Sequence, residues 1–154
     1  MKISTRAHYG LRAMVTLARL SVTSNQPVSV ADLAKAEGLP ENYLEQLVGA
    51  LRRGGLLKSY RGAYGGYQLT RPATDISALD VLNAVGEKLD FPECTTTGCT
   101  RSLVRGEECE CAPFWRVLNN AMQFTASHIT IQHLMENKLP TDFVHLDFMQ
   151  GPTE

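Results

Sequence analysis

Apolar residues recur at helical spacing near the start of the chain. Between residues 4 and 21, apolar side chains three or four positions apart form one stripe, and Ser4 and Thr5 stand before it as candidate N-caps. The pattern predicts a first helix over residues 4–21, with an apolar face formed by Ala7, Leu11, Met14, Val15 and Ala18.

Two shorter helices are predicted after a polar break. Ser29 can cap the first of them, and Gly38 ends it. Pro40 is expected in the first turn of the second, where a missing backbone N–H is tolerated. The apolar positions of the two helices are Leu33 and Ala34 in the first, and Leu44, Leu47, Val48 and Leu51 in the second.

A pair of short strands is predicted next, at residues 56–59 and 66–70. They flank the sequence RGAYGG, whose glycines suit a tight turn and whose Arg61 would project from it. Two short helices joined at a glycine are a weak sign of DNA binding, because many helical hairpins bind no nucleic acid. Followed by a basic, glycine-rich hairpin, they predict a winged helix-turn-helix.

The second half of the chain alternates helices with a polar segment. An amphipathic helix capped near Ser77 is expected, then a cysteine-rich loop at 91–112, then a long helix at 113–130 that we expect to pair with its copy in a dimer. The fold class is therefore mainly α with a small β wing. We divide the chain into a DNA-binding domain at 1–72, a segment at 73–137 for cysteine ligands and dimerisation, and a tail at 138–154.

Charge separates the same two halves. Residues 1–72 carry ten Lys/Arg against four Asp/Glu, a net charge of +6, whereas residues 73–154 carry five against twelve, a net charge of −7. A basic first half favours a polyanionic partner. The sequence shows no membrane span, no export signal, and no nucleophile–base set or phosphate loop, so we expect a cytoplasmic protein that is not an enzyme.

All four cysteines fall within eighteen residues, at Cys94, Cys99, Cys109 and Cys111. Their polar neighbours argue against core cysteines, and a reducing cytoplasm argues against structural disulfides. Metal binding is the leading interpretation, with an iron–sulfur cluster favoured over zinc because a loose loop can supply its thiolates. A thiol redox switch is the remaining alternative.

The chain resembles the bacterial winged-helix regulators that include IscR, NsrR, RirA and CymR. The resemblance lies in the start MKISTRAHYGLRAM, in NYLEQLVGALRRGGLLKSYRGAYGGYQL, and in the clustered cysteines followed by Trp115. It implies a homodimer that binds a palindromic operator in double-stranded DNA. Many members hold a cluster, here expected as 2Fe–2S with 4Fe–4S as the alternative, that senses redox state, iron or nitric oxide. A cluster-free regulator switched by thiols or by a partner protein is the alternative function.

The resemblance also implies site residues. The expected DNA contacts are Asn42, Tyr43, Glu45, Gln46, Arg52 and Arg61, with Arg61 entering the minor groove from the wing. Cys94, Cys99 and Cys109 match three family ligands, although the gap between the second and the third is long. The fourth ligand is expected to be Cys111, with His8 of the partner subunit or an external molecule as the alternatives.

Overall fold

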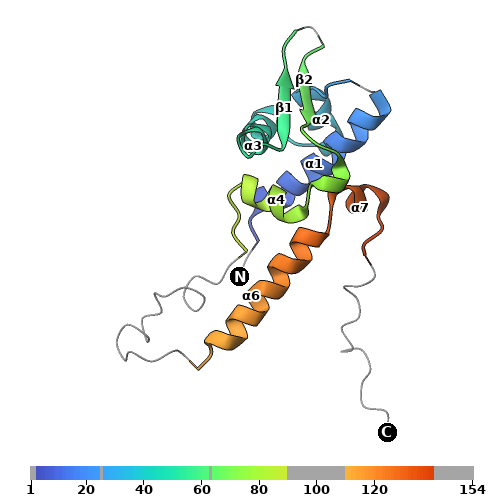
Figure 1. Cartoon of the computed structure of the whole chain (residues 1–154). Coiled ribbons are helices and arrows are strands. Elements are labelled where there is room, and N and C mark those ends of the chain that lie inside the picture. The colour runs from blue at the N-terminus through green and yellow to red at the C-terminus, as the bar shows by residue number, and fades with distance from the viewer. Residues whose placement is uncertain (1–2, 25, 63, 90–109, 141–154) are drawn as a thin grey trace.

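The computed structural model describes residues 3–24, 26–62, 64–89 and 110–140 (Figure 1). Helices make up most of this part of the chain, and one antiparallel pair of strands accompanies them. In chain order the elements are α1 (Thr5–Ser24), α2 (Val30–Glu37), α3 (Glu41–Arg53), β1 (Leu57–Tyr60), β2 (Gly66–Leu69), the 3-10 helix η1 (Ala73–Asp75), α4 (Ala78–Ala84), α6 (Ala112–His128) and α7 (Ile131–Glu136).

Helix α1 lies at the centre of the body and packs against α2, α3, α4 and α7. Its predicted apolar stripe is confirmed, since Ala7, Met14 and Ala18 are buried, and Ser4 caps its start by accepting a hydrogen bond from the backbone N–H of Ala7. The largest fully buried side chains are Met14, Leu17, Leu33, Leu44, Leu47, Leu51, Leu56, Ile76, Ile131, Val48 and Val81. These residues form one core that joins the helix-turn-helix to the later helices.

The α2–α3 pair has the geometry of a helix-turn-helix. Ser29 caps α2 by accepting from the backbone N–H of Asp32, and Gly38 ends it in the left-handed region with a φ of 67°. The predicted place of Pro40 is wrong by one position. Pro40 is the N-cap of α3, with an extended backbone and no side-chain hydrogen bond, and the helix begins at Glu41.

The predicted wing is present as a hairpin of β1 and β2 (Figure 1). Leu57 pairs with Leu69 at the base of the hairpin, and Tyr60 pairs with Gly66 near its tip. Leu57 is buried, whereas the rest of β1 is exposed. The hairpin is therefore held at its base and projects from the body.

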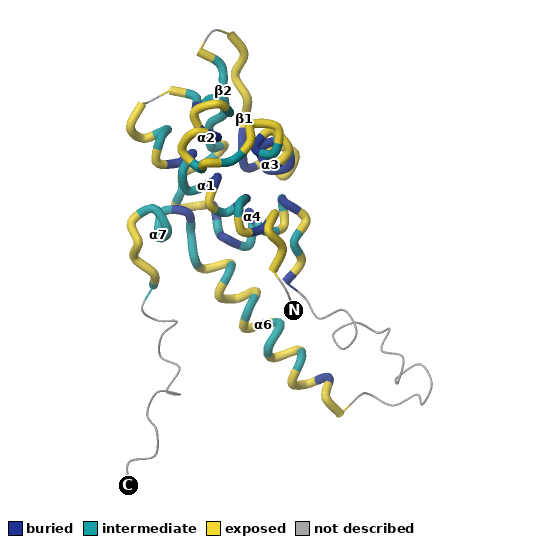
Figure 2. The backbone as a smooth tube through the Cα atoms, turned by 180° about the vertical axis from the view of Figure 1, so that it is seen from behind, coloured by how far each residue is buried: buried dark blue, intermediate teal, exposed yellow. Residues whose placement is uncertain are grey.

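The helices after the wing differ in part from the prediction. The helix expected after Ser77 is α4, which ends at Ala84, because Gly86 leaves the helix with a φ of 85°. The long helix is confirmed as α6, which extends away from the body and is exposed or half-buried over most of its length (Figure 2). Helix α7 was not predicted. It follows α6 directly, with Ile131 fully buried at its start.

No helix in the described part of the chain is long and apolar enough to cross a membrane.

Candidate nucleic-acid interface

Helix α3 divides its residues between the core and solvent. Leu44, Leu47, Val48 and Leu51 are almost completely buried. On the opposite side, exposed residues recur at spacings of three, four and seven, which places them on one stripe of the helix. These residues are Asn42, Glu45, Gln46, Arg52 and Arg53. We call them the reading stripe.

The reading stripe has a chemical gradient along the helix. Asn42, Glu45 and Gln46, near the start, offer amide and carboxylate groups, which form hydrogen bonds with base edges. Arg52 and Arg53 lie in the last turn, where positive charge is stabilised by the helix dipole and can contact phosphates. The stripe can therefore read bases at one end and hold the backbone at the other.

Tyr43 occupies a different position from the other predicted contacts. It is half-buried, packs against the core and meets the ring of Tyr9 edge to face, with ring centroids 6.0 Å apart. The structure thus places Tyr43 on the flank of α3, between the reading stripe and α1.

The wing carries positive charge along β1 and directly after it. Arg61 is exposed directly after β1, and Lys58 lies on β1 with its Nζ 5.5 Å from the ring centroid of Tyr60. Gly65 closes the turn by donating a backbone hydrogen bond to Gly62. Both β1 and α3 belong to the same end of the body (Figure 1).

A second contact fixes the direction of the wing. Val28, in the linker between α1 and α2, pairs with Tyr67 of β2 through two backbone hydrogen bonds of 2.9 and 2.8 Å. Gly66 permits this approach, because a Cβ there would lie 2.5 Å from the carbonyl oxygen of Val28. Strand β2 is therefore attached to the linker that leads into α2.

Arg71, just beyond the wing, is engaged within the fold. It donates to the carbonyl oxygen of Asp75 and to a carboxylate oxygen of Asp80, 3.0 Å away. Asp80 also forms a capping box with Ser77 at the start of α4. Partial burial acts to raise the pKa of Asp80, but the hydrogen bonds from Ser77 and the charge of Arg71 outweigh it and hold this pKa below its usual value.

Of the proposed cluster ligands, Cys94, Cys99 and Cys109 lie outside the described residues. Cys111 is exposed and is the N-cap residue of α6, with its carbonyl oxygen accepting from the backbone N–H of Trp115. His8 is exposed on α1, where its ring lies against that of Tyr9. Within the described residues, no three His, Cys, Asp or Glu side chains come together as a metal site.

Sequence reasoning missed an ion pair between α1 and α2. Arg12 of α1 forms an ion pair with Glu37 of α2, with 2.8 Å between Nη2 and Oε2. The two residues are too far apart in the sequence for any helical or strand period to relate them. Only the packing of α1 on α2 brings them together.

Comparisons with known proteins agree with this geometry. The family model Rrf2, described as an iron-dependent transcriptional regulator, matches residues 3–137. A protein of Azotobacter vinelandii, named ORF2 and described as an HTH-type transcriptional regulator, is 36% identical over 98% of this chain and 90% of its own length. The HTH-type transcriptional regulator IscR of Klebsiella pneumoniae is 33% identical, over 90% of this chain and 82% of its own.

A solved structure is similar over the same range. CymR, described as the global cysteine regulator of B. subtilis, matches with a TM-score of 0.73 and 33% identity, covering 90% of this chain and 98% of its own. The winged-helix fold predicted from the sequence is thereby confirmed, and so is the expectation that the protein is not an enzyme.

Proposed function

Because the chain belongs to the Rrf2 family of transcriptional regulators, we propose that it is a homodimer that binds a palindromic operator, with an affinity set by an iron–sulfur cluster on its cysteine segment. The observation that carries the proposal is the exposed reading stripe of α3, which lies at the same end of the body as the hairpin that carries the exposed Arg61. The two elements together match how winged helices engage a duplex, with the helix in the major groove and the wing along the backbone or in the minor groove.

Each predicted contact has a distinct chemical role in this proposal. Asn42 and Gln46 can both donate to and accept from base edges in the major groove. Glu45 only accepts, so it pairs with the amino group of cytosine and is repelled by phosphates. Arg52 holds a phosphate, and Arg61 enters the minor groove.

Dimerisation is supported by the exposure of α6. Phe114, Val117 and Phe124 have 61%, 69% and 56% of their surface exposed, which is unusual for three large apolar side chains on one helix. The helix has 17 residues and is therefore about 25 Å long, which gives a second copy a long surface to pack on. A two-fold dimer of this kind reads two half-sites, which is why the operator is proposed to be palindromic.

The donor set of the cysteine segment fits an iron–sulfur cluster. Cys94, Cys99, Cys109 and Cys111 supply four thiolates within eighteen residues, and the exposed Cys111 stands at the start of α6. We propose a 2Fe–2S cluster, with 4Fe–4S as the alternative. We propose Cys111 as its fourth ligand, with His8 of the partner subunit or an external molecule as the alternatives. A bound cluster would make the regulator responsive to redox state, iron or nitric oxide in the cytoplasm.

A second candidate is a cluster-free regulator in which the cysteine thiols, or a partner protein, act as the switch. Two observations support this candidate. The thiol of Cys111 is exposed, and the chain is similar to CymR, described as a global cysteine regulator.

Anaerobic purification separates the two candidates. Under the first, the protein retains iron and sulfide and shows broad visible absorbance, and removing the cluster changes its affinity for the operator. Colourless protein that binds its operator equally well with and without added iron and sulfide would contradict the cluster.

Two variants test the fourth ligand. Cys111→Ala is expected to reduce the iron and sulfide retained, because it removes a thiolate, whereas His8→Ala should leave the visible circular dichroism unchanged. The opposite pattern would assign the fourth position to His8.

A further inference from the structure

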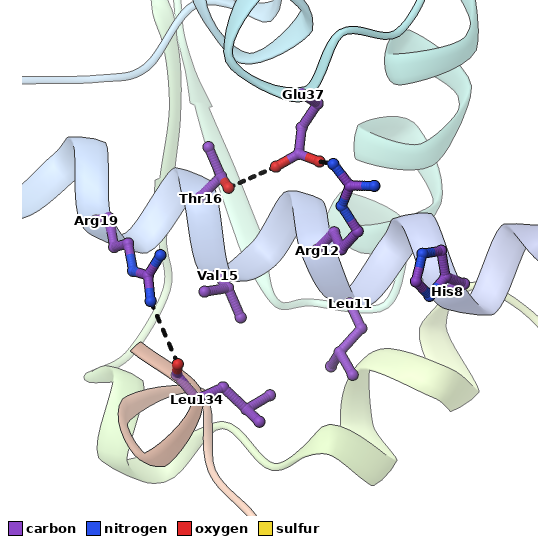
Figure 3. A pocket seen from close by; sticks show the side chains of 8 residues that line it. All are labelled: His8, Leu11, Arg12, Val15, Thr16, Arg19, Glu37 and Leu134. Carbon is purple, nitrogen blue, oxygen red and sulfur yellow. Dashed lines mark hydrogen bonds and ion pairs between the residues drawn. The ribbon is translucent and has the colours of Figure 1, made fainter. Parts of the chain in front are cut away.

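Helix α1 contacts the helix-turn-helix on both sides of its turn. Tyr9, Arg12 and Thr16 lie three and four residues apart, so they share one face of α1. Thr16 donates to Oε1 of Glu37, the last residue of α2, and Arg12 pairs with Oε2 of the same carboxylate (Figure 3). Tyr9, on the same face, meets Tyr43, the third residue of α3.

Arg12 joins these two contacts into one cluster. Its guanidinium carbon lies 5.5 Å from the ring centroid of Tyr9, within the range of a cation–π interaction, while its Nη2 reaches Glu37. The ring of Tyr9 meets that of Tyr43 at 88°, which is the favourable edge-to-face arrangement. We call Tyr9, Arg12, Glu37 and Tyr43 the arginine–tyrosine cluster.

The carboxylate of Glu37 depends on this cluster. Its side chain is only 4% exposed, and within the described residues no hydrogen bond reaches Oε2, so the charge of Arg12 compensates it. A buried carboxylate without its partner is strongly unfavourable, so the carboxylate and the guanidinium stay together. The ion pair therefore holds the guanidinium of Arg12 in place. The guanidinium in turn holds the ring of Tyr9, which contacts Tyr43.

The start of α3 has no side-chain cap. Its N-cap, Pro40, makes no side-chain hydrogen bond, whereas α2 and α4 are capped by Ser29 and Ser77. The apolar stripe of α3 holds the helix against the core, but apolar packing is non-directional. Hydrogen bonds to bases require a placement within about 0.5 Å and 10–20°. Asn42, Glu45 and Gln46 all lie at this end of the helix.

We infer that Arg12 and Glu37 are positioning residues for sequence-specific DNA binding. Through Tyr9 and Tyr43 they hold the first turn of the recognition helix at the angle that base reading requires. The inference rests on the proposed function, because it presupposes that α3 reads bases.

Arg12 can be substituted without disturbing the core. It lines an open pocket of about 450 Å³ together with His8, Leu11, Val15, Arg19 and Leu134, and its side chain is 46% exposed (Figure 3). Arg12→Gln and Glu37→Gln both break the ion pair, but they change the net charge in opposite directions. Electrostatic attraction to DNA alone would lower affinity in the first variant and raise it in the second.

Arg19→Gln is the matched control. Arg19 lies two turns further along α1, lines the same pocket and has the same charge, but it donates to the carbonyl oxygens of Leu134 and Met135 in α7. It makes no described contact with α3. Loss of its charge should weaken binding to every duplex equally.

The experiment uses a duplex that the full-length protein enriches from a random-sequence pool, with a scrambled duplex of the same composition for comparison. Arg12→Gln and Glu37→Gln are each expected to lower the ratio of the two affinities by about tenfold, as for the loss of one good base contact. Arg19→Gln should leave this ratio unchanged, and Arg12→Lys, which keeps the charge beside Glu37, should restore part of it.

Thermal unfolding of each variant separates positioning from stability. Suppose that Arg19→Gln and Arg12→Gln lower the melting temperature equally and also lower the ratio of the two affinities equally. The cluster then serves stability only, and the inference is overturned. An unchanged ratio in both Arg12→Gln and Glu37→Gln also overturns it. If the wild-type protein enriches no sequence, the proposed function itself fails, and the inference with it.

Discussion

Replacing Gly66 with alanine tests how the wing is attached to the rest of the DNA-binding half. A Cβ at this position would lie 2.5 Å from the carbonyl oxygen of Val28 and 2.6 Å from its carbonyl carbon. Both are backbone atoms, so no side-chain rotation relieves the contact. Gly66 is not among the residues with a positive φ, so the cost of Gly66→Ala comes from this close approach and not from backbone strain.

The expected loss of stability follows from the bonds that must yield. Moving β2 away from Val28 lengthens both backbone hydrogen bonds between Val28 and Tyr67. Each such bond contributes about 0.5–1.5 kcal/mol net, so Gly66→Ala should lower the free energy of unfolding by about 1–3 kcal/mol. For a chain of this size, that corresponds to a decrease in melting temperature of roughly 2–12 °C.

DNA binding should suffer as well, because the displaced wing carries Arg61. Urea denaturation followed by circular dichroism measures the stability, and fluorescence anisotropy on a fixed duplex at several salt concentrations measures the affinity. Gly49→Ala is the control for stability. Its Cβ would meet only the mobile end of Arg53, at 3.5 Å, and alanine should stabilise helix α3 by about 0.5–1 kcal/mol. Wild-type stability and wild-type affinity in Gly66→Ala would refute the attachment of the wing through Val28.

Four further outcomes are expected from the same geometry. Arg61→Ala should weaken operator binding by about 1–3 kcal/mol and flatten its salt dependence without lowering the melting temperature; an unchanged salt titration would contradict the wing contact. Glu45→Ala should loosen sequence choice while non-specific affinity stays equal or rises, and an equal loss on every duplex would exclude base reading by this carboxylate. Val117→Glu should yield monomers by light scattering together with loss of binding to a palindromic duplex, whereas a monomeric wild type would end the dimer proposal. The pKa of Asp80 is lowered in the folded state, so its contribution to stability is present above the ordinary carboxyl pKa and is lost as the pH falls through the folded pKa. Asp80→Asn should therefore reduce the loss of stability at acidic pH. An unchanged loss at acidic pH would show that Asp80 does not cause it.

Much of the fold is predictable from the sequence because its helices are amphipathic. The stripe of α3 repeats at helical spacing, and this period alone assigns Asn42, Glu45 and Gln46 to solvent. The same reasoning identifies α1 and α6. Helix α7 escaped it because six residues are too short for a period to show, and because its capping box uses His133 where Glu or Gln is usual.

The contacts that support the reading stripe could not be predicted in this way. Arg12 and Glu37 are both charged residues on amphipathic helices, and each alone fits an ordinary solvated face. Their pairing depends on how α1 crosses α2, which is decided by the apolar packing of the core. Sequence patterns identify the exposed residues of a helix more readily than they identify the contacts between helices.

Gly66 in the wing is another residue whose structural role the sequence does not reveal. In the sequence, Gly66 is one of several glycines around a turn, and turn chemistry is a sufficient reason for it. An isolated two-stranded hairpin is marginally stable, however, so the direction of this wing must be set by contact with the rest of the domain. That contact is the pairing of Val28 with Tyr67, which requires the two backbones to approach where Gly66 has no side chain. The position of Arg61 relative to the reading stripe therefore depends on a residue whose role becomes visible only when the linker after α1 is placed beside β2.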